Sequence, residues 1–224
     1  MNGYMVKQFD TIEERVAHLK KEIPPSVTLV GVTKGVDLSD IQKAVAVGIT
    51  HVGENRVQSA KEKKSQLHTL PIVWHMIGHL QSNKVKEAVR IFDLIQSVDS
   101  LSLAQRIGEV ATQEKKRQRI LLQLNLSGDN KSGFSLEACA RALPEVLHLS
   151  GIQVDGFMTM APYTSEEGRI REVFRRLKSF QVDQTTTLKT EFPILSMGMT
   201  NDYPLALLEG STMVRIGRYI FEER

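Results

Sequence analysis

Short apolar runs alternate with longer amphipathic segments along almost the whole chain. Runs of this length are typical of buried strands, and the segments between them have the periodicity of helices. The runs that we assign to strands are residues 27–33, 50–53, 72–77, 94–98, 120–126, 153–158, 194–197 and 213–216. Several of them are continuously apolar, as in parallel strands that helices cover. The pattern therefore predicts an α/β fold with a parallel sheet.

Two of the intervening segments carry clear helical signals. The sequence Thr164-Ser165-Glu166-Glu167 has the capping-box pattern of a helix start. Apolar stripes at helical spacing are Ile170, Val173, Phe174, Leu177 and Phe180 after this box, and Leu103, Ala104, Ile107, Val110 and Ala111 after Ser100. We expect both stripes to pack in the core.

The strands could form an open, doubly wound sheet or a closed barrel. Eight strand-helix units in 224 residues favour the barrel. An open sheet would usually carry a G-x-G-x-x-G turn after its first strand, whereas this strand runs into Thr33-Lys34-Gly35. No Pro/Gly/Ser-rich linker interrupts the chain. We therefore predict a single (β/α)8 TIM barrel that forms one domain over residues 1–224.

Composition limits the cellular setting and the partners. The surplus of 29 Lys and Arg over 26 Asp and Glu is too small to indicate nucleic-acid or membrane binding. We assign the basic run 114–119, which lacks aromatic residues, to a solvated helix end. The single cysteine, Cys139, lies in a helical segment and suits a reducing compartment. With a charged N-terminus and no membrane-length apolar run, we expect a cytoplasmic protein.

Chemistry in a barrel of this type collects where the strands end. The first strand ends at Lys34, which either extends from the rim into water or attacks an aldehyde as a Schiff-base lysine. The second strand ends in Gly53-Glu54-Asn55, where the polar side chains could be helix caps only. These positions leave the function open.

Histidines lie on or after the second and third predicted strands. His51, His75 and His79 could serve a metal-dependent hydrolase, although the spacing of the last two spans a strand and a glycine turn. We favour His79 as a polar wall of a pocket, and we expect no metal site.

The last two strands end in glycine turns. These are Leu195-Ser196-Met197-Gly198-Met199 and Val214-Arg215-Ile216-Gly217-Arg218. The loops after strands seven and eight form a recurrent phosphate site of this barrel, although both glycines could serve the turns alone. A lysine that forms imines, together with a phosphate site, fits pyridoxal 5'-phosphate (PLP). A phosphorylated sugar bound by a Schiff-base aldolase would fit equally well.

Longer motifs resemble a known family. Val30-Gly31-Val32-Thr33-Lys34, Gly53-Glu54-Asn55, the run from Trp74 to Lys84, Gly156-Phe157-Met158-Thr159-Met160 and the two glycine turns are similar to the YggS/PROSC family of PLP homeostasis proteins. The resemblance covers the chain nearly end to end. It implies a barrel of the alanine racemase N-terminal type (PLP fold type III) without the second β domain of racemases.

The resemblance also implies roles for individual residues. Lys34 would hold PLP as a Schiff base, and Ser196, Gly198 and Gly217 would bind its phosphate. Arg215 would lie near the ring or the phosphate, and Asn55 would line the pocket. The sequence leaves open whether Lys131, in Gly128-Asp129-Asn130-Lys131-Ser132-Gly133, provides a second Schiff-base site.

The family's implied function is intracellular vitamin B6 homeostasis, as a PLP carrier or regulator without an established reaction. An arginine that faced the ring nitrogen would discourage its protonation and weaken the cofactor as an electron sink. Apo forms of PLP-dependent enzymes are the partners that carriage implies, and we expect a monomer. The alternative is a PLP-dependent amino-acid racemase or a related enzyme.

Overall fold

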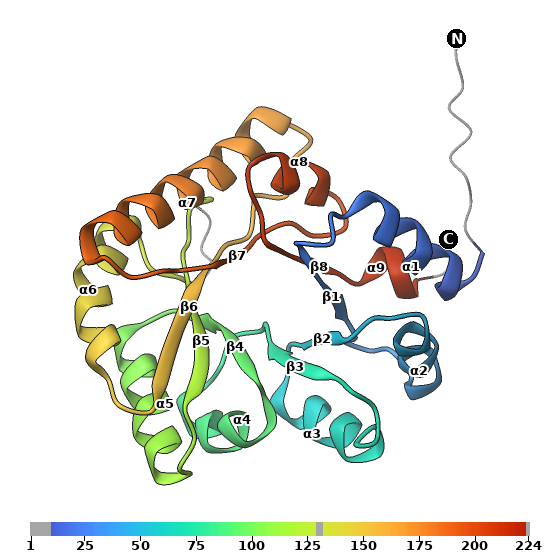
Figure 1. The fold of residues 1–224 in the computed structure, drawn as a ribbon, viewed down its shortest axis with the longest axis horizontal. Helices are drawn as coiled ribbons and strands as arrows, with labels where there is room; N and C mark the ends of the chain where they lie inside the picture. Colours follow the sequence, from blue (N-terminus) through green and yellow to red (C-terminus); the bar gives the residue numbers. More distant parts are fainter. Residues whose placement is uncertain (1–9, 129–131, 223–224) are drawn as a thin grey trace.

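The computed structural model of this chain describes residues 10–128 and 132–222. Its eight parallel strands close into a barrel in chain order, with helices around the outside (Figure 1). The strands are β1 (Thr28–Val32), β2 (His51–Glu54), β3 (Val73–Met76), β4 (Leu94–Val98), β5 (Gln118–Gln123), β6 (Ile152–Met158), β7 (Ile194–Ser196) and β8 (Met213–Ile216). The predicted barrel is confirmed, and β4 and β8 have the predicted bounds.

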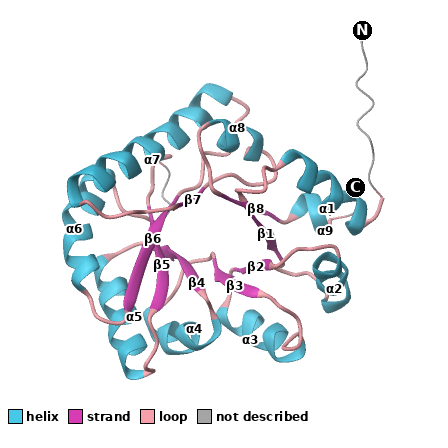
Figure 2. Ribbon diagram, in the orientation of Figure 1, coloured by secondary structure: helices cyan, strands magenta, loops and turns pink. Residues whose placement is uncertain are grey.

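Helices form the outer layer, as Figure 2 shows in cyan around the magenta strands. They are α1 (Ile12–Glu22), α2 (Leu38–Ala46), α3 (Val57–Gln66), α4 (Val85–Ile91), α5 (Leu101–Gln113), α6 (Leu136–His148), α7 (Glu167–Leu188), α8 (Tyr203–Leu208) and α9 (Arg218–Phe221), with the 3-10 helix η1 (Ser82–Lys84) before α4. No helix among the described residues combines the length and the apolar character that a membrane span requires.

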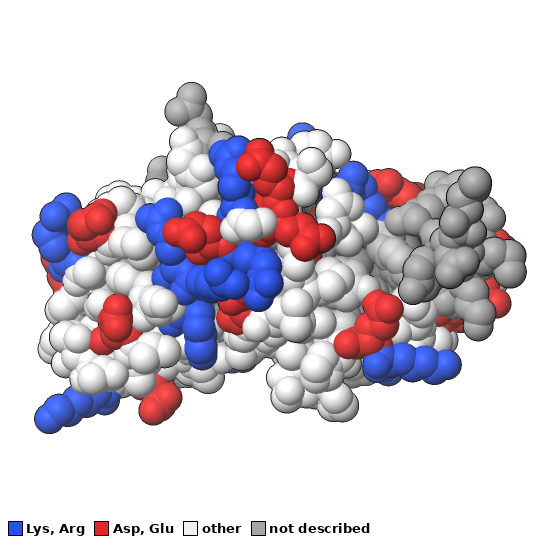
Figure 3. Space-filling view, turned by 90° about the horizontal axis from the view of Figure 1, so that it is seen from above, with Lys and Arg blue, Asp and Glu red and all other residues white. Residues whose placement is uncertain are grey.

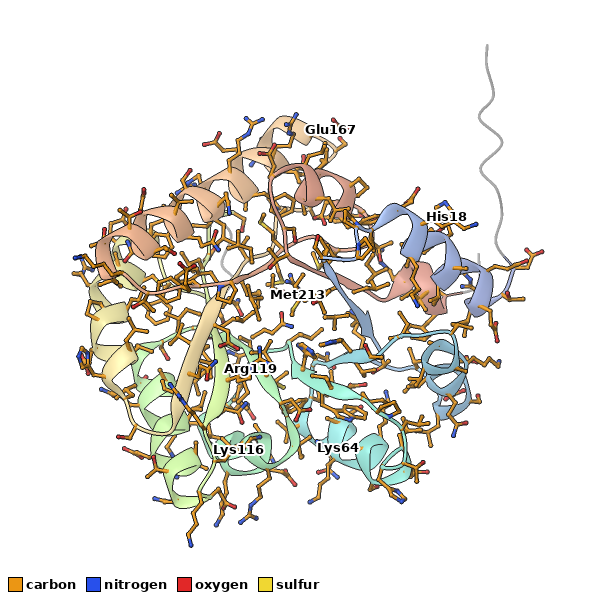
Figure 4. The ribbon with its side chains drawn as sticks, in the orientation of Figure 1. His18, Lys64, Lys116, Arg119, Glu167 and Met213 are labelled. Carbon is orange, nitrogen blue, oxygen red and sulfur yellow. The ribbon has the colours of Figure 1, made fainter. Side chains whose placement is uncertain are left out.

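The core has two parts because strand side chains alternate between the two faces of the sheet. The larger part fills the space between strands and helices and includes Trp74, Phe92 and Phe174. A second, small apolar cluster consists of Val30, Leu94, Leu121, Met158 and Met213. Met213 lies inside the ring of strands in Figure 4. This small cluster fills only part of the barrel interior, and polar side chains occupy much of the rest.

The stripes predicted for α5 and α7 are buried, which confirms them. The predicted capping box is wrong, because α7 begins only at Glu167. Thr164 therefore precedes the helix, and its hydroxyl accepts a hydrogen bond from the Glu166 N–H in a local turn. The pattern placed the helix correctly but started it too early.

The basic run 114–119 begins as the expected solvated helix end, since Glu114 is the C-cap of α5 and Lys115 is exposed, but the expectation is wrong for the rest of the run. Helix α5 ends at Gln113, and Lys116 donates hydrogen bonds to the carbonyls of Val89 and Phe92 at the end of α4. Arg119 lies in β5 and pairs with Asp155. Lys116 thus caps a neighbouring helix, and the last two residues of the run, Gln118 and Arg119, belong to the barrel.

Acidic and basic side chains are mixed on the face of the molecule that Figure 3 shows. Ion pairs such as that of Arg171 with Glu209 join them.

Candidate functional site

Lys34 follows β1 at the carboxyl end of the barrel. Its side chain is exposed, and none of the described residues accepts a hydrogen bond from its ammonium group. The neighbouring turn at Gly35 has φ +70, a left-handed conformation that glycine adopts without strain. The lysine amine is therefore free to reach a ligand at this end of the barrel.

The residue before this lysine is fixed by a buried polar cluster. The Thr33 hydroxyl donates to the Glu54 carboxylate at 2.6 Å, and Lys63 Nζ donates to the same carboxylate at 2.8 Å and to the Thr33 carbonyl at 2.5 Å. Ser59 donates a further hydrogen bond to Glu54, whose side chain is fully buried. Strand β2 and helix α3 thus hold the backbone from which Lys34 extends.

Two glycine turns lie at the same end of the barrel, after β7 and β8. Gly198 has φ +98, and a Cβ there would lie 2.7 Å from the Ala206 Cβ. The Arg215 N–H donates to the Gly198 carbonyl at 3.0 Å, so the first turn is tied to β8. A Cβ at Gly217 would lie 2.9 Å from the Val32 carbonyl oxygen. Both positions exclude a side chain and bring their backbone close to neighbouring strands.

Arg215 is a buried cation inside the barrel. Its guanidinium donates to the Ser196 hydroxyl at 2.6 Å and to the Thr159 carbonyl at 3.0 Å, and none of the described carboxylates forms an ion pair with it. Burial lowers the pKa of Arg215 to about 10, while the charge of Asp202 opposes this shift. The group therefore stays charged at neutral pH, and a buried charge without a counterion favours an anionic ligand.

Asp202 organises the turn between β7 and α8. Its carboxylate accepts a hydrogen bond from the Met199 N–H, which fixes the backbone that follows Gly198. Burial raises the pKa of the Asp202 carboxyl, against the effects of that hydrogen bond and of Arg215.

Hydrogen bonds continue from Arg215 across the barrel interior. The Ser196 hydroxyl bonds Gln96 Oε1 at 2.6 Å, and Gln96 Nε2 lies 2.8 Å from His75 Nδ1. His75 Nε2 lies 2.8 Å from His51 Nδ1. Ser196, Gln96, His75 and Arg215 are buried, and His51 is partly exposed. These side chains form one connected chain from β8 to β2.

The structure separates the three histidines of the predicted sites. His51 and His75 face each other inside the barrel, whereas His79 is exposed beyond β3 and pairs with Asp99 at 3.1 Å. No group of three or more His, Cys, Asp or Glu within residues 10–128 and 132–222 could hold a metal ion. The described residues thus offer no ligand set for the metal-hydrolase alternative.

The remaining predicted site residues lie on strands or directly after them. Asn55 is exposed directly after β2, at the same end as Lys34, and the backbone of Gly78 packs against it. Lys131 lies outside the described residues. The predicted residues Lys34, Gly198 and Gly217 thus belong to turns at one end of the barrel, while Ser196 and Arg215 project into its interior.

Sequence reasoning missed Gln96, His75 as an interior partner, and Asp202. Gln96 had a recognisable signal, since it is a polar residue within an otherwise largely apolar predicted strand. Asp202 had none, because its role depends on how the turn after β7 folds back on Met199.

Comparisons with known proteins agree on one family. The model of the family described as "Alanine racemase, N-terminal domain" matches residues 8–224. A PLP homeostasis protein of Synechocystis is 38% identical over 204 residues, which cover 90% of this chain and 94% of the relative. The PLP homeostasis protein of Escherichia coli K12 is 35% identical, over 90% of this chain and 87% of the relative.

Solved structures show the same barrel. The structure of PipY from Synechococcus elongatus PCC7942 with PLP bound has a TM-score of 0.90 and 37% identity, covering 94% of this chain and 100% of that one. An alanine racemase of Clostridium difficile 630 has a TM-score of 0.83 at 14% identity, with 97% of this chain and 58% of the racemase covered. The second likeness shows a shared fold only.

Proposed function

We propose that this chain, which belongs to the family of pyridoxal phosphate homeostasis proteins, binds PLP at the carboxyl end of its barrel. In this proposal it acts in intracellular vitamin B6 homeostasis as a carrier or regulator of the cofactor. The relatives' names and the PLP bound to PipY support the ligand. The observation that carries the proposal is the burial of the Arg215 cation among neutral partners, with no counterion among the described residues.

The residues present fit PLP, which combines an anionic phosphate with an aldehyde. Described acceptors take up two hydrogen bonds of the Arg215 guanidinium, at Ser196 and Thr159, and the other N–H groups remain for an anion. The close approaches at Gly198 and Gly217 keep side chains away from the turns where backbone N–H groups could face a phosphate. Lys34 supplies an amine with which no group in residues 10–128 and 132–222 forms a hydrogen bond or ion pair.

Roles follow for each residue. Lys34 forms a Schiff base with the aldehyde, a reaction that releases one water. Gly198 and Gly217 bind the phosphate, and Asn55 lines the pocket. We keep Arg215 as a ligand of the ring or of the phosphate. Because the hydroxyl of Ser196 already bonds Arg215 and Gln96, we propose that Ser196 aids PLP binding through Arg215.

The test is to locate the covalent link. Purified protein is incubated with PLP, reduced with borohydride and digested, and the labelled peptide is identified by mass spectrometry. We expect the label on Lys34 and none on Lys84, an exposed lysine in η1 after β3. A label spread over many lysines, or the absence of a visible absorption band before reduction, would refute the proposal.

Carriage and catalysis need separate assays. A carrier transfers PLP to an apo-enzyme faster than free PLP reaches it, and equal rates would leave only binding or buffering. A racemase would exchange the α-hydrogen of amino acids in deuterated water above the rate of free PLP. We propose a cytoplasmic monomer, with residues 1–224 as a single PLP-binding domain, and its mass in solution tests the oligomeric state.

A further inference from the structure

The hydrogen-bond chain inside the barrel has only one direction that satisfies all its members. A guanidinium has no acceptor, so Arg215 must donate to the Ser196 hydroxyl. The hydroxyl has one proton, which it donates to Gln96 Oε1 at 2.6 Å. The direction of the first two hydrogen bonds in the chain therefore follows from Arg215, which can only donate.

The same logic fixes the amide of Gln96. With Oε1 toward Ser196, Nε2 has two acceptors, His75 Nδ1 at 2.8 Å and Met213 Sδ at 3.2 Å. The flipped amide would place its oxygen against the lone pair of the Met213 sulfur and leave the Ser196 proton without a described acceptor. Gln96 thus donates to His75.

The histidine tautomers follow. His75 Nδ1 accepts a hydrogen bond, so neutral His75 carries its proton on Nε2 and donates it to His51 Nδ1 at 2.8 Å. His51 in turn carries its own proton on Nε2. Every link from Arg215 to His51 then runs in the same direction.

We propose that Gln96 and His75 are positioning residues for Arg215, and that this one-directional chain keeps the Ser196 hydroxyl as an acceptor that fixes the guanidinium toward the bound cofactor. The inference rests on the proposed PLP binding. If the direction were reversed at His75, Gln96 would donate to Ser196, and the hydroxyl would face two donors with its own proton unpaired.

The charges around the chain agree with a neutral His75. Burial lowers the pKa of His75 to about 3, and His51 and Arg119 add to this effect. Burial and the charge of Arg119 also lower the pKa of His51, while Asp93 opposes them. Asp155 pairs with Arg119 at the amino ends of the strands. Arg215 is the charged group at the other end of the hydrogen-bond chain. The charge of Asp202 raises its pKa, against the lowering by burial.

The first experiment measures the tautomers in the protein without cofactor, by nitrogen-15 NMR of labelled histidine. We expect neutral His75 with its proton on Nε2. In Gln96→Glu, the new carboxylate should place a second proton on His75 Nδ1, a change that a merely structural role for residue 96 would not produce. A wild-type His75 with its proton on Nδ1, or a charged His75 at neutral pH, would overturn the proposal.

The second experiment compares two buried strand serines. Ser196→Ala should weaken PLP binding about tenfold, since it removes a hydrogen bond to a charged group, and should shift the visible band. Ser97→Ala is the matched control, because the Ser97 hydroxyl is buried without a described partner. Gln96→Met should also weaken PLP binding, as Ser196→Ala does.

The outcomes separate the two proposals. If the wild type bound PLP normally and both Ser196→Ala and Gln96→Met retained its affinity and spectrum, the positioning role would be overturned. A wild type that bound no PLP would instead overturn the proposed function. The tautomer measurement on the wild type needs no cofactor and no variant that could fail to fold, so it tests the direction of the chain in either case.

Discussion

The two sides of the barrel mouth differ in how they hold their functional group. On the side of β7 and β8, Arg215 is buried and its guanidinium is bonded to Ser196 and Thr159. On the side of β1 and β2, the Lys34 side chain is exposed and has no partner among the described residues, whereas the preceding residue, Thr33, is fixed.

The difference matches what each group would do. A cation that recognises an anion gains from a fixed orientation, because the cost of ordering it is met when the protein folds. An amine that must approach an aldehyde, and release it to a recipient, needs freedom to move. We infer that the arginine side provides recognition and that the lysine side provides the reversible covalent link.

Lys34→Ala should have the largest effect on cofactor binding, because it removes the amine that forms the Schiff base. We expect the visible absorption band and the borohydride-trapped product to disappear. Residual PLP binding should persist through the arginine side, and equilibrium dialysis measures it. A Lys34→Ala protein that still gave a trapped product would place the covalent link elsewhere and break the comparison.

Arg215→Met should weaken PLP binding about a hundredfold, since it removes charge-assisted hydrogen bonds from a buried site. Titration monitored by the visible band measures the affinity. The matched control is Arg119→Met, because Arg119 follows the first residue of β5 at the opposite end of the barrel. Its loss leaves Asp155 without its partner and should lower stability, with little change in affinity. Equal losses of affinity in both variants would contradict the assigned role of Arg215.

Glu54→Ala tests how the lysine side is fixed. Removing this buried carboxylate leaves the Thr33 hydroxyl without its acceptor and Lys63 without its ion-pair partner, and should cost about 3 kcal/mol of unfolding free energy in urea titrations. Schiff-base formation at Lys34 should also slow.

The control for this variant is Glu87→Ala. Glu87 pairs with Lys61 at the surface, so its loss should cost under about 1 kcal/mol. If Glu54→Ala lowered the free energy of unfolding no more than Glu87→Ala does, the buried cluster would not fix Thr33.

The sequence predicted the barrel well, because strand periodicity depends on burial that every strand shares. The run 94–98 was predicted to the residue, since it is buried along its whole length. The start of α7 was not, because the Thr164 hydroxyl bonds within a turn before the helix. Local hydrogen bonding of this kind competes with helix capping, and the motif alone does not distinguish the two.

The places of the candidate site residues were predictable where they depend on position along a strand, and less so where they depend on contacts across the barrel. Lys34, Gly198 and Gly217 follow strand ends, which a count of strands identifies. The partners of Ser196 come from β4 and β8, about a hundred residues and nineteen residues away in sequence. Only the closed barrel brings them together, so no spacing rule could have assigned the Ser196 hydroxyl to Gln96 and Arg215.

Acid should destabilise the folded protein through His75, the buried histidine in the hydrogen-bond chain that ends at Arg215. The folded pKa of His75, about 3, lies below its ordinary value of 6.5, so the unfolded chain binds the extra proton between these values. The unfolding free energy should therefore fall as the pH drops below 6.5 and continue to fall toward 3. Above pH 6.5, His75 is neutral in both the folded and the unfolded chain, so it adds nothing to the pH dependence.

Comparison with His75→Gln isolates this effect from the carboxylates that titrate in the same range. The variant's pH dependence should be shallower than that of the wild type by about 1 kcal/mol per pH unit, measured by urea unfolding on both sides of pH 6.5. His68→Gln, which removes an exposed histidine from the turn after α3, should leave the slope unchanged. If His75→Gln also left it unchanged, His75 would take up its proton in the folded barrel, and the direction of the chain that fixes Arg215 would be wrong.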